Sequence, residues 1–358
     1  MKKIIWLTNL PAPYRIEFFN QLGQFVDLQV IFERSKSDNR NINWFDYNFN
    51  NFKGIILEGK CLKDMQKIKK ILSQEKFDFA FNSDYSSCLG MYFYFLCKKE
   101  NIKLILEADG GIPKYRGPLD KIISLIMRSY SFYFSSGRYT DLYFKYYNID
   151  ENKIIHYNFT SLTENEIKIN SMHKLREDEH ILNILSIGQQ IYRKGFDILI
   201  KAISKLDFEI TVDIIGGKPS PEIKKMIIDN SLENIKFYDF MKKEELNEYF
   251  LKADMFVLPS REEIWGLVVN EAISFNLPVI TSDNCIAGKE FCDLAEIGLI
   301  YENENYTDLA NKIKTLHDDQ EMRYKLSRNC ELINMEFTIE NMAKKHVDFI
   351  YNYKSEGQ

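Results

Sequence analysis

Short apolar runs alternate regularly with longer amphipathic segments along this sequence, from Lys2 to about Tyr301. Short apolar runs bounded by helical patterns are typical of parallel strands that are covered on both faces. The predicted strands span residues 2–8, 28–32, 77–83, 102–108, 131–136 and 153–159 in the first half, and 181–187, 209–216, 234–240, 253–260, 277–283 and 298–301 in the second. The alternation therefore predicts an α/β fold.

Helical patterns fill the intervals between these runs. They span residues 14–25, 62–73, 86–99, 118–130 and 138–147, then 194–205, 221–230, 243–252, 266–276, 306–317 and 321–334. A length of 358 residues favours two domains. The polar, charged stretch 160–180 lacks an apolar run, so we expect the interdomain connection there. The prediction is two doubly wound Rossmann-like domains, residues 1–163 and 181–335, joined by 164–180 and followed by a C-terminal helix in 336–358 that packs back towards the first domain.

Charge is distributed unevenly between the two halves. Residues 1–163 hold 23 Lys+Arg against 17 Asp+Glu, a balance of +6, whereas the remaining residues hold 24 against 35, a balance of −11. A basic first half favours an anionic partner there, although ordinary surface scatter would give the same balance. We expect no nucleic-acid partner.

Cysteine spacing and hydropathy indicate the cellular compartment in which we expect the protein. Six cysteines without a C-x-x-C pair or zinc-type spacing argue against a disulfide framework or a structural metal. The apolar run 4–7 is too short for an export signal, and no stretch approaches the ~20 apolar residues of a membrane span. We therefore expect a cytoplasmic protein.

The segment 186–203, SIGQQIYRKGFDILIKAI, has the form of a phosphate-binding loop. A predicted strand ends at Gly188, a short loop carries Arg193 and Lys194, and a helix starts at about Gly195. Cations beside the free N–H groups of a helix N-terminus form a site for phosphate. The structural alternative is a solvated loop tip.

A second segment, 256–283, places two glutamates just after another predicted strand. Glu263 lies in the loop, and Glu271 lies within the following helix beside apolar residues. A carboxylate on an apolar face needs a hydrogen-bond partner to offset desolvation, and ligand hydroxyls are one such partner. The structural alternatives are a carboxylate favoured at a helix start for Glu263 and an ion pair for Glu271.

Together these two segments resemble the retaining glycosyltransferases of family 4, which have the GT-B fold. The family's first pattern reads glycine, arginine, leucine, three variable positions, lysine and glycine, followed by a helix with an alanine. The residues that match it are Gly188, Lys194, Gly195 and Ala202. The residues that match the family's paired-glutamate signature are Glu263, Gly266, Glu271, Ala272 and Pro278. Gln189 stands where arginine is usual. The resemblance implies two Rossmann-like domains that face each other across a cleft.

The resemblance also implies roles in binding a nucleotide-sugar donor, with UDP-sugar expected and no metal or other cofactor. Lys194 would stabilise the departing diphosphate and Glu271 would bind the ribose hydroxyls. Glu263 would act on the transferred sugar together with the backbone N–H groups of Trp265, Gly266, Leu267 and Val268. Because Gln189 is uncharged, we expect Arg193 to supply the second phosphate contact. The other donor-binding residues expected are Gly188, Gly216, Phe240 and Met241, the last three in loops that would hold the base.

The first half would bind the acceptor. Pro13 is expected to start a helix, with Tyr14 and Arg15 facing the cleft. A later strand ends at a Gly110-Gly111 turn, which would place Glu107 and Asp109 at the mouth of the cleft. Many relatives have a histidine near this point, and this sequence has none there. Asp109 or Glu107 would therefore be the polar group nearest the reacting sugar, and we assign the catalytic role to Asp109. The alternative is a plain turn aspartate.

Residues 114–130 combine an apolar face with the cations Lys114, Arg116, Lys121 and Arg128. A basic amphipathic helix can lie on an anionic membrane surface, although the same pattern also occurs in helices packed on a sheet. The sequence thus allows a peripheral location on the inner face of the cytoplasmic membrane.

The function predicted is retaining, metal-independent transfer of a sugar to a glycan or lipid-linked acceptor in bacterial surface polysaccharide or glycoconjugate synthesis. Two alternatives remain open at this level. One is a catalytically silent GT-B subunit that stabilises a partner transferase, and the other is a sugar-nucleotide epimerase on the same fold.

Overall fold

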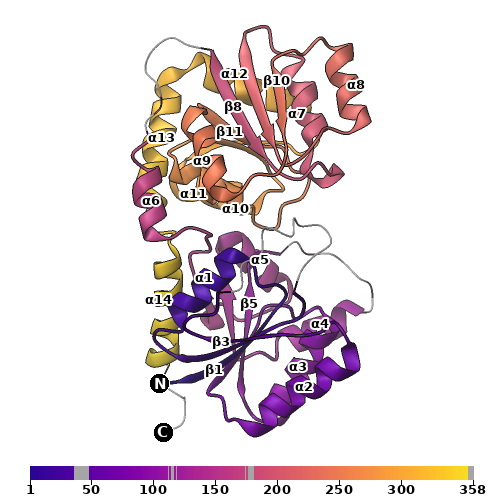
Figure 1. Cartoon of the computed structure of the whole chain (residues 1–358), viewed down its shortest axis with the longest axis vertical. Coiled ribbons are helices and arrows are strands. Elements are labelled where there is room, and N and C mark those ends of the chain that lie inside the picture. The colour runs from indigo at the N-terminus through magenta and orange to yellow at the C-terminus, as the bar shows by residue number, and fades with distance from the viewer. Residues whose placement is uncertain are drawn as a thin grey trace. The chain divides into compact units, whose positions relative to one another are not determined.

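The computed structural model describes residues 1–35, 48–111, 113, 117, 119–173, 175 and 181–353. The chain divides into two compact units (Figure 1). Unit 1 comprises Met1–Ser161 with Thr338–Gln358, and unit 2 comprises Leu162–Phe337. The segment expected to be only a connection begins instead with a helix of unit 2, α6 (Glu164–Asn170), whose N-terminus has a capping box between Thr163 and Glu166.

Unit 1 is built on a parallel sheet of seven strands in the order β3-β2-β1-β4-β5-β6-β7. Its strands are β1 (Lys3–Thr8), β2 (Asp27–Phe32), β3 (Lys53–Ile56), β4 (Phe79–Asn82), β5 (Lys103–Ala108), β6 (Phe132–Ser135) and β7 (Ile154–His156). The interior strand β1 pairs with β2 from Lys3 opposite Asp27, and with β4 from Ile4 opposite Phe79. The edge strand β3 is absent from the sequence prediction because its four residues, KGII, are only partly buried.

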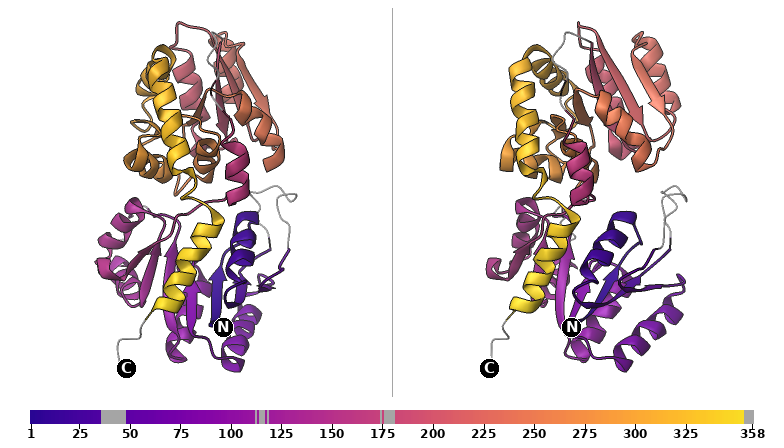
Figure 2. Two further views of the ribbon diagram at one scale, coloured as in Figure 1. Left: turned by 90° about the vertical axis from the view of Figure 1, so that its left-hand side faces the viewer. Right: turned by 60° about the vertical axis from the view of Figure 1, so that its left-hand side comes forward.

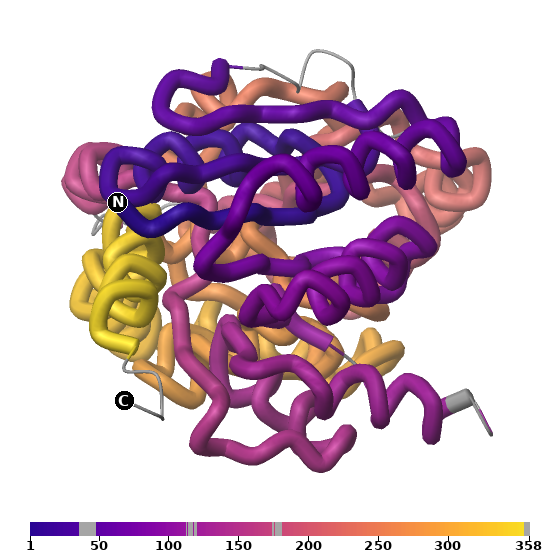
Figure 3. Tube along the Cα trace, turned by 90° about the horizontal axis from the view of Figure 1, so that it is seen from below, coloured from indigo at the N-terminus to yellow at the C-terminus, as the bar shows by residue number. Residues whose placement is uncertain are grey.

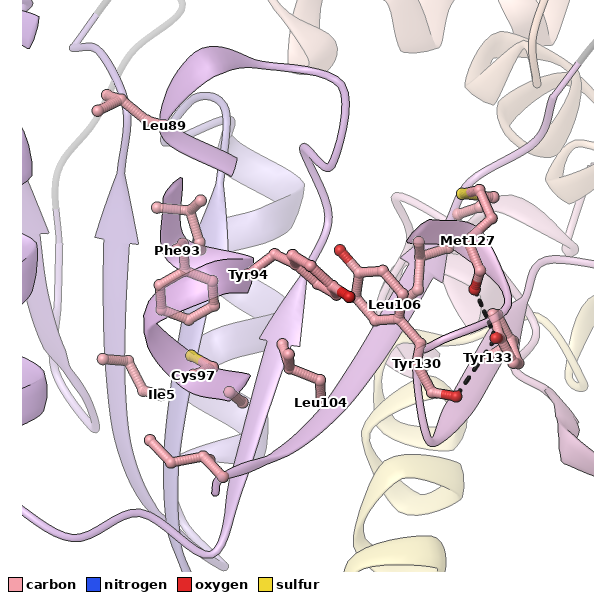
Figure 4. Close-up of a cluster of buried hydrophobic side chains, with 14 of the residues drawn as sticks. Ile5, Leu89, Phe93, Tyr94, Cys97, Leu104, Leu106, Met127, Tyr130 and Tyr133 are labelled. Carbon is pink, nitrogen blue, oxygen red and sulfur yellow. Dashed lines mark hydrogen bonds between the residues drawn. The ribbon is translucent and has the colours of Figure 1, made fainter. Parts of the chain in front are cut away.

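Helices cover both faces of this sheet: α1 (Pro13–Leu22), α2 (Cys61–Gln74), α3 (Cys88–Lys99), α4 (Leu119–Met127), α5 (Arg138–Tyr146) and α14 (Ile339–Asn352). On one face, α3 packs Phe93, Tyr94 and Cys97 into a cluster with Ile5 and Leu104 of the strands (Figure 4). Burial of this apolar surface is the main force that holds helix and sheet together.

The opposite face is covered by α1 and α14, which contact each other. Figures 2 and 3 show α14, in yellow, beside the N-terminal segment, so the chain returns to unit 1 after completing unit 2. His346 of α14 is fully buried and stacks on Phe134 with ring centroids 4.3 Å apart. The Tyr351 hydroxyl donates a hydrogen bond of 2.8 Å to the carbonyl of Phe25.

Unit 2 has a parallel sheet of six strands in the order β10-β9-β8-β11-β12-β13. Its elements are β8 (Leu182–Ile187), α7 (Phe196–Ile203), β9 (Ile210–Ile215), α8 (Pro221–Asp229), β10 (Ile235–Tyr238), α9 (Lys243–Lys252), β11 (Met255–Leu258), α10 (Leu267–Ser274), β12 (Val279–Ser282), α11 (Ile286–Ala295), β13 (Gly298–Tyr301), α12 (Tyr306–Asp318) and α13 (Gln320–Asn334). The strand order reverses between β8 and β11. Ligands of doubly wound sheets bind beyond the carboxyl ends of strands at such a point, which here directs attention to the loops after β8 and β11.

The helix predicted over 194–205 is divided in the structure. A short 3-10 helix, η3 (Tyr192–Lys194), precedes Gly195, and α7 begins only at Phe196. Gly195 has φ of 68°, and a Cβ there would lie 2.0 Å from the carbonyl oxygen of Pro259. Only glycine fits this left-handed, closely packed position, so the backbone turns sharply between η3 and α7.

None of the helices in the described part of the chain has both the length and the apolar character needed to cross a bilayer.

Candidate functional site

The loops after β8 and β11 bring the two predicted motifs of unit 2 together at one carboxylate. The Lys194 ammonium forms an ion pair with the Glu263 carboxylate, and both side chains are mostly buried. Arg193 Nη1 lies 3.1 Å from Glu263 Oε2 and donates a hydrogen bond of 2.7 Å to the carbonyl of Glu262. Because two cations meet one carboxylate, this cluster carries a net positive charge and favours an anion beside it.

Arg261 fixes the relative position of these two loops. Its guanidinium binds the Asp197 carboxylate through two hydrogen bonds of 2.8 and 2.7 Å and also donates to the carbonyl of Tyr192. Its backbone N–H donates to the carbonyl of Arg193 at 2.8 Å. Although burial opposes it, the Arg261 guanidinium holds the pKa of Asp197 below its usual range. This bidentate pair ties the β11 loop to η3 and to the first turn of α7.

The backbone around Glu263 is fixed by the next loop of the sheet. The N–H of Glu263 donates to the carbonyl of Asn284 at 3.0 Å, and the N–H of Ile286 donates back to the carbonyl of Glu263 at 3.2 Å. Gly266 then adopts φ of 101°, which favours glycine, and α10 begins at Leu267. This turn fixes the position at which the Glu263 side chain leaves the backbone.

The start of α10 contains the remaining residues of the paired-glutamate signature. The Trp265 side chain is buried and its Nε1 donates to Asn270 Oδ1 at 2.9 Å. Leu267 and Val268 form the first turn of α10, where backbone N–H groups have no partner within the helix. Glu271 is half-buried on the same helix, next to the buried Ala272. The expected position of Glu271 beside an apolar face therefore agrees with the structure.

The loop after β9 lies against the loop after β8. Gly216 and Gly217 have φ of 129° and 136°, and both backbone N–H groups donate to the carbonyl of Tyr238. A Cβ on Gly216 would lie 2.2 Å from the carbonyl oxygen of Gly188, so the two loops touch through their backbones. This close approach brings Gly188 and Gly216 together.

The other predicted donor-binding residues lie at the surface of unit 2. Gln189 is exposed, Phe240 is 43% exposed, and Met241 is half-buried in the loop after β10. An exposed aromatic ring at the end of a strand is available to contact a ligand, so the geometry is compatible with the expected role of Phe240.

In unit 1, Arg15 and Glu107 form a buried pair rather than facing solvent. Arg15 Nη1 and Nη2 donate to the two carboxylate oxygens of Glu107 at 3.0 and 2.5 Å, and Ser83 Oγ donates to Glu107 Oε2 at 2.5 Å. The two residues are 3% and 1% exposed. Both side chains, which were expected at the mouth of a cleft, are therefore buried, because opposite charges that satisfy each other can be buried together.

Asp109 is the member of this cluster that reaches the surface. Its side chain is 32% exposed and its Oδ1 lies 3.7 Å from Arg15 Nη2. The Tyr157 hydroxyl donates to Asp109 Oδ1 at 2.7 Å. Desolvation and the nearby Glu107 carboxylate raise the pKa of Asp109, while Arg15 and Tyr157 oppose the shift. Asp109 is thus held in place by buried neighbours.

The other predicted residues of this side lie nearby along the chain. Pro13 is the first residue of α1, as expected. Tyr14 is half-buried with its ring 5.8 Å from that of Phe159, and Gly110 has φ of 148°.

Sequence reasoning missed a second carboxyl group at the carboxyl edge of this sheet. Glu33 directly follows β2, and Ser87 Oγ donates to its Oε1 at 2.5 Å. Burial raises the pKa of Glu33 to about 7, and the adjacent Asp84 adds to the shift. The rule used for Asp109, a polar residue just after a strand, would have identified Glu33 as well.

The predicted membrane helix is described only in part. Lys114 and Arg116 lie outside the described residues, and α4 begins at Leu119. Ile122 and Leu125 are 56% and 62% exposed on α4, with Lys121 and Arg128 also exposed. The inner side of α4 packs on the core through residues 123 and 126. Within the described residues there is no group of three or more His, Cys, Asp or Glu side chains arranged for a metal ion.

Comparison with known proteins places this site in context. Residues 168–332 match the model of the family described as glycosyl transferases group 1. The chain is 31% identical over 156 residues to an uncharacterised glycosyltransferase of Methanocaldococcus jannaschii, which covers 44% of each chain. It is 30% identical over 213 residues to an uncharacterised 41.2 kDa protein in the cps region of Klebsiella pneumoniae, which covers 57% of each chain.

A third relative is the amylovoran biosynthesis glycosyltransferase AmsK of Erwinia amylovora, 34% identical over 125 residues, or 31% of this chain and 30% of that one. The chain thus spans 30% to 57% of the length of these relatives.

Solved structures match over nearly the whole chain. A glycosyltransferase of Rickettsia africae superposes with a TM-score of 0.78, covering 99% of this chain and 100% of its own, at 14% identity. The Anabaena protein HepE in complex with UDP and glucose gives a TM-score of 0.72 with 99% and 100% coverage, at 12% identity. At such low identity these matches show the fold. Residues 168–332 therefore match the group 1 glycosyltransferase family, and the two units have the GT-B fold.

Proposed function

We propose that this chain is a retaining, metal-independent glycosyltransferase that moves a sugar from a nucleoside-diphosphate sugar, UDP-sugar first, to a glycan or lipid-linked acceptor. The pathway proposed is bacterial surface polysaccharide or glycoconjugate synthesis. The observation that carries the proposal is the contact of Lys194 and Arg193 with Glu263 at the carboxyl ends of β8 and β11.

The donor side of the proposal rests on charge and position. Lys194 and Arg193 supply more positive charge than Glu263 neutralises, so a diphosphate beside them is stabilised. Negative charge on the diphosphate grows as the glycosidic bond breaks, and a fixed ammonium is then most effective. Glu263, held by the backbone of two loops, is assigned to hydroxyls of the transferred sugar, and Glu271 to the ribose hydroxyls.

Catalysis then consists mainly of orientation and electrostatic stabilisation. The acceptor hydroxyl attacks the face of the sugar from which the nucleotide leaves, and we name no protein nucleophile. Asp109 is the proposed polar group on the acceptor side, because it is the exposed member of a cluster with Arg15, Glu107 and Tyr157. No metal is assigned a role, and Lys194 and Arg193 are proposed to offset part of the diphosphate charge.

The comparisons support the reaction class and the donor. The Klebsiella relative lies in a cps region, the Erwinia relative takes part in amylovoran biosynthesis, and HepE was solved with UDP and glucose. The exposed apolar and basic residues of α4 support a further element of the proposal, reversible contact with an anionic membrane surface.

Binding of nucleoside diphosphate to the variant Glu271→Ala tests this function. Calorimetry with UDP, GDP and ADP should identify a nucleotide that binds the parent protein. The variant should bind it about 1–3 kcal/mol more weakly, the cost of losing a charge-assisted hydrogen bond. Glu248→Ala serves as the control, because Glu248 is an exposed residue of α9 paired with Lys252.

Unchanged affinity in Glu271→Ala would remove the ribose assignment. Nucleotide binding without turnover of any sugar nucleotide, even with acceptors present, would favour the silent-subunit alternative. Release of UDP that needs no acceptor would favour an epimerase.

A further inference from the structure

Gln190 lies in the loop between β8 and η3, and its side-chain carboxamide is buried. Within the described residues, neither Nε2 nor Oε1 of Gln190 has a hydrogen-bond partner. Buried polar groups in folded proteins are almost always hydrogen bonded, because an unpaired group gives up water without compensation. An amide with both ends unpaired therefore calls for an explanation.

The surroundings of Gln190 place this amide at the junction of the β8 and β9 loops. Gln190 Cγ would lie 3.3 Å from a Cβ on Gly217, whose φ of 136° favours glycine. The neighbouring Gly216 approaches the carbonyl oxygen of Gly188 so closely that a Cβ would lie 2.2 Å from it. The amide thus lies where the loops assigned to the base and to the phosphates meet.

The family pattern that this segment resembles has leucine two positions after the glycine that corresponds to Gly188, whereas this chain has Gln190. Phosphate binding by the loop therefore does not require an amide here, and a chain that buries one at this position gains a hydrogen-bonding group that leucine lacks.

The chemistry of a carboxamide narrows the class of ligand. Nε2 donates and Oε1 accepts, so a partner must offer an acceptor and a donor side by side. Phosphate oxygens only accept and would leave Oε1 unpaired. The edge of a nucleobase and the diol of a ribose each present both kinds of group. Resting on the proposed function, we propose that Gln190 binds the nucleoside half of the donor and contributes to donor specificity.

The test compares a nucleotide with its phosphates alone. Gln190→Met keeps the length of the side chain and removes both polar amide atoms. By calorimetry, the variant should bind the nucleoside diphosphate preferred among UDP, GDP and ADP about tenfold or more weakly, the scale of a lost hydrogen-bonded pair. Inorganic pyrophosphate should bind parent and variant equally. Without ligand, the thermal midpoint of the variant should not fall, because an unpaired polar group has been removed.

Gln29→Met is the matched control. Gln29 is a buried residue of β2 in unit 1, and its Nε2 also lacks a partner within the described residues. The same substitution there should leave nucleotide affinity unchanged.

Each other outcome overturns the inference in a distinguishable way. Equal affinity of Gln190→Met and parent for the nucleoside diphosphate shows that the amide does not meet the nucleoside. Equal weakening for nucleotide and pyrophosphate shows that the amide only shapes the phosphate loop. A parent protein that binds none of the three nucleotides overturns the proposed function itself.

Discussion

At the scale of single residues, Glu263 is the centre of the candidate site because it joins two segments that are distant in sequence. Lys194 and Glu263 were predicted from separate local motifs, each recognised from residues that directly follow a strand. Their contact follows from the parallel sheet, in which the carboxyl ends of β8 and β11 meet. Local pattern and the family resemblance together named these two residues, the structure brings them into contact, and their roles stay a prediction.

Other parts of the site were not accessible to local reasoning. Arg261 and Asp197 pair across 64 residues, and Arg15 and Glu107 pair across 92 residues. Such partners become visible only when the strand order is known, since nothing in the neighbouring sequence marks them. For the same reason the sequence predicted Arg15 as a cleft residue, although Glu107 holds it in the interior.

The prediction at this scale concerns Lys194. Lys194→Ala should lower turnover of the sugar nucleotide by a factor of about 100 or more, because the ammonium stabilises charge that develops as the diphosphate leaves. The measurement is the rate of nucleoside diphosphate release. Lys201→Ala, a change of an exposed cation on α7, should leave that rate unchanged. Near-parental turnover in Lys194→Ala would transfer the role to Arg193 or another cation.

At the scale of elements, the pattern of apolar runs predicted the positions of the strands better than it predicted the ends of the helices. Predicted strands matched β1, β2 and β4–β13 because each lies within a short apolar run, although β7, β10 and β13 are only partly buried. The structure adds α6 and α11, two helices that the sequence prediction did not contain. Most of the seven residues of α6 are polar, so it shows no strong helical apolar period. In α11, Ile286, Ala287 and Phe291 are buried on one side of the helix, so its period is present and the prediction missed it.

The helix α14 gives the prediction at this scale. His346 is fully buried, Nδ1 contacts the carbonyl of Met342 at 2.8 Å, and Nε2 lies 3.8 Å from Glu107 Oε1. Burial lowers the pKa of His346 from 6.5 to about 3, and the nearby Arg15 acts in the same direction. Between pH 3 and pH 6.5, His346 therefore binds a proton in the unfolded chain but not in the folded chain. The contribution of His346 to stability is therefore complete above pH 6.5 and is lost as the pH falls towards 3.

His346→Gln should remove this dependence. At pH 7.5 the variant should be less stable than the parent, since ring packing is lost. At pH 5 the difference in free energy of unfolding should shrink by about 2 kcal/mol, because only the parent pays for a neutral histidine. Urea unfolding at both pH values measures it. Phe349→Leu, a packing change on α14 without a titratable group, should destabilise equally at both. A constant gap for His346→Gln would contradict a neutral buried imidazole.

At the scale of the whole molecule, charge and exposed apolar residues predict reversible contact of unit 1 with an anionic membrane. Each cation near such a surface contributes about 1 kcal/mol, so four cations bind weakly and salt weakens them further. Glutamine at all four of Lys114, Arg116, Lys121 and Arg128 should release the protein from anionic liposomes in a sedimentation assay while nucleotide binding persists.

A matched variant distinguishes a loss of local membrane contact from an effect of the changed net charge. Glutamine at four exposed lysines of unit 2 gives the same change in charge and should leave liposome binding intact: Lys224, Lys225, Lys236 and Lys252. Failure of the parent protein to bind such liposomes at low salt would mean that α4 only packs on the core and that the acceptor is soluble.

Transfer of a sugar from a nucleotide donor releases nucleoside diphosphate, and this release can be measured. The unaltered protein is incubated with UDP-, GDP- and ADP-sugars in the presence of glycan and lipid-linked acceptors, and the nucleotide products are separated by chromatography. We expect one donor, UDP-sugar first, to yield its nucleoside diphosphate in step with a glycosylated acceptor. Sugar nucleotides recovered intact across the whole panel would contradict it.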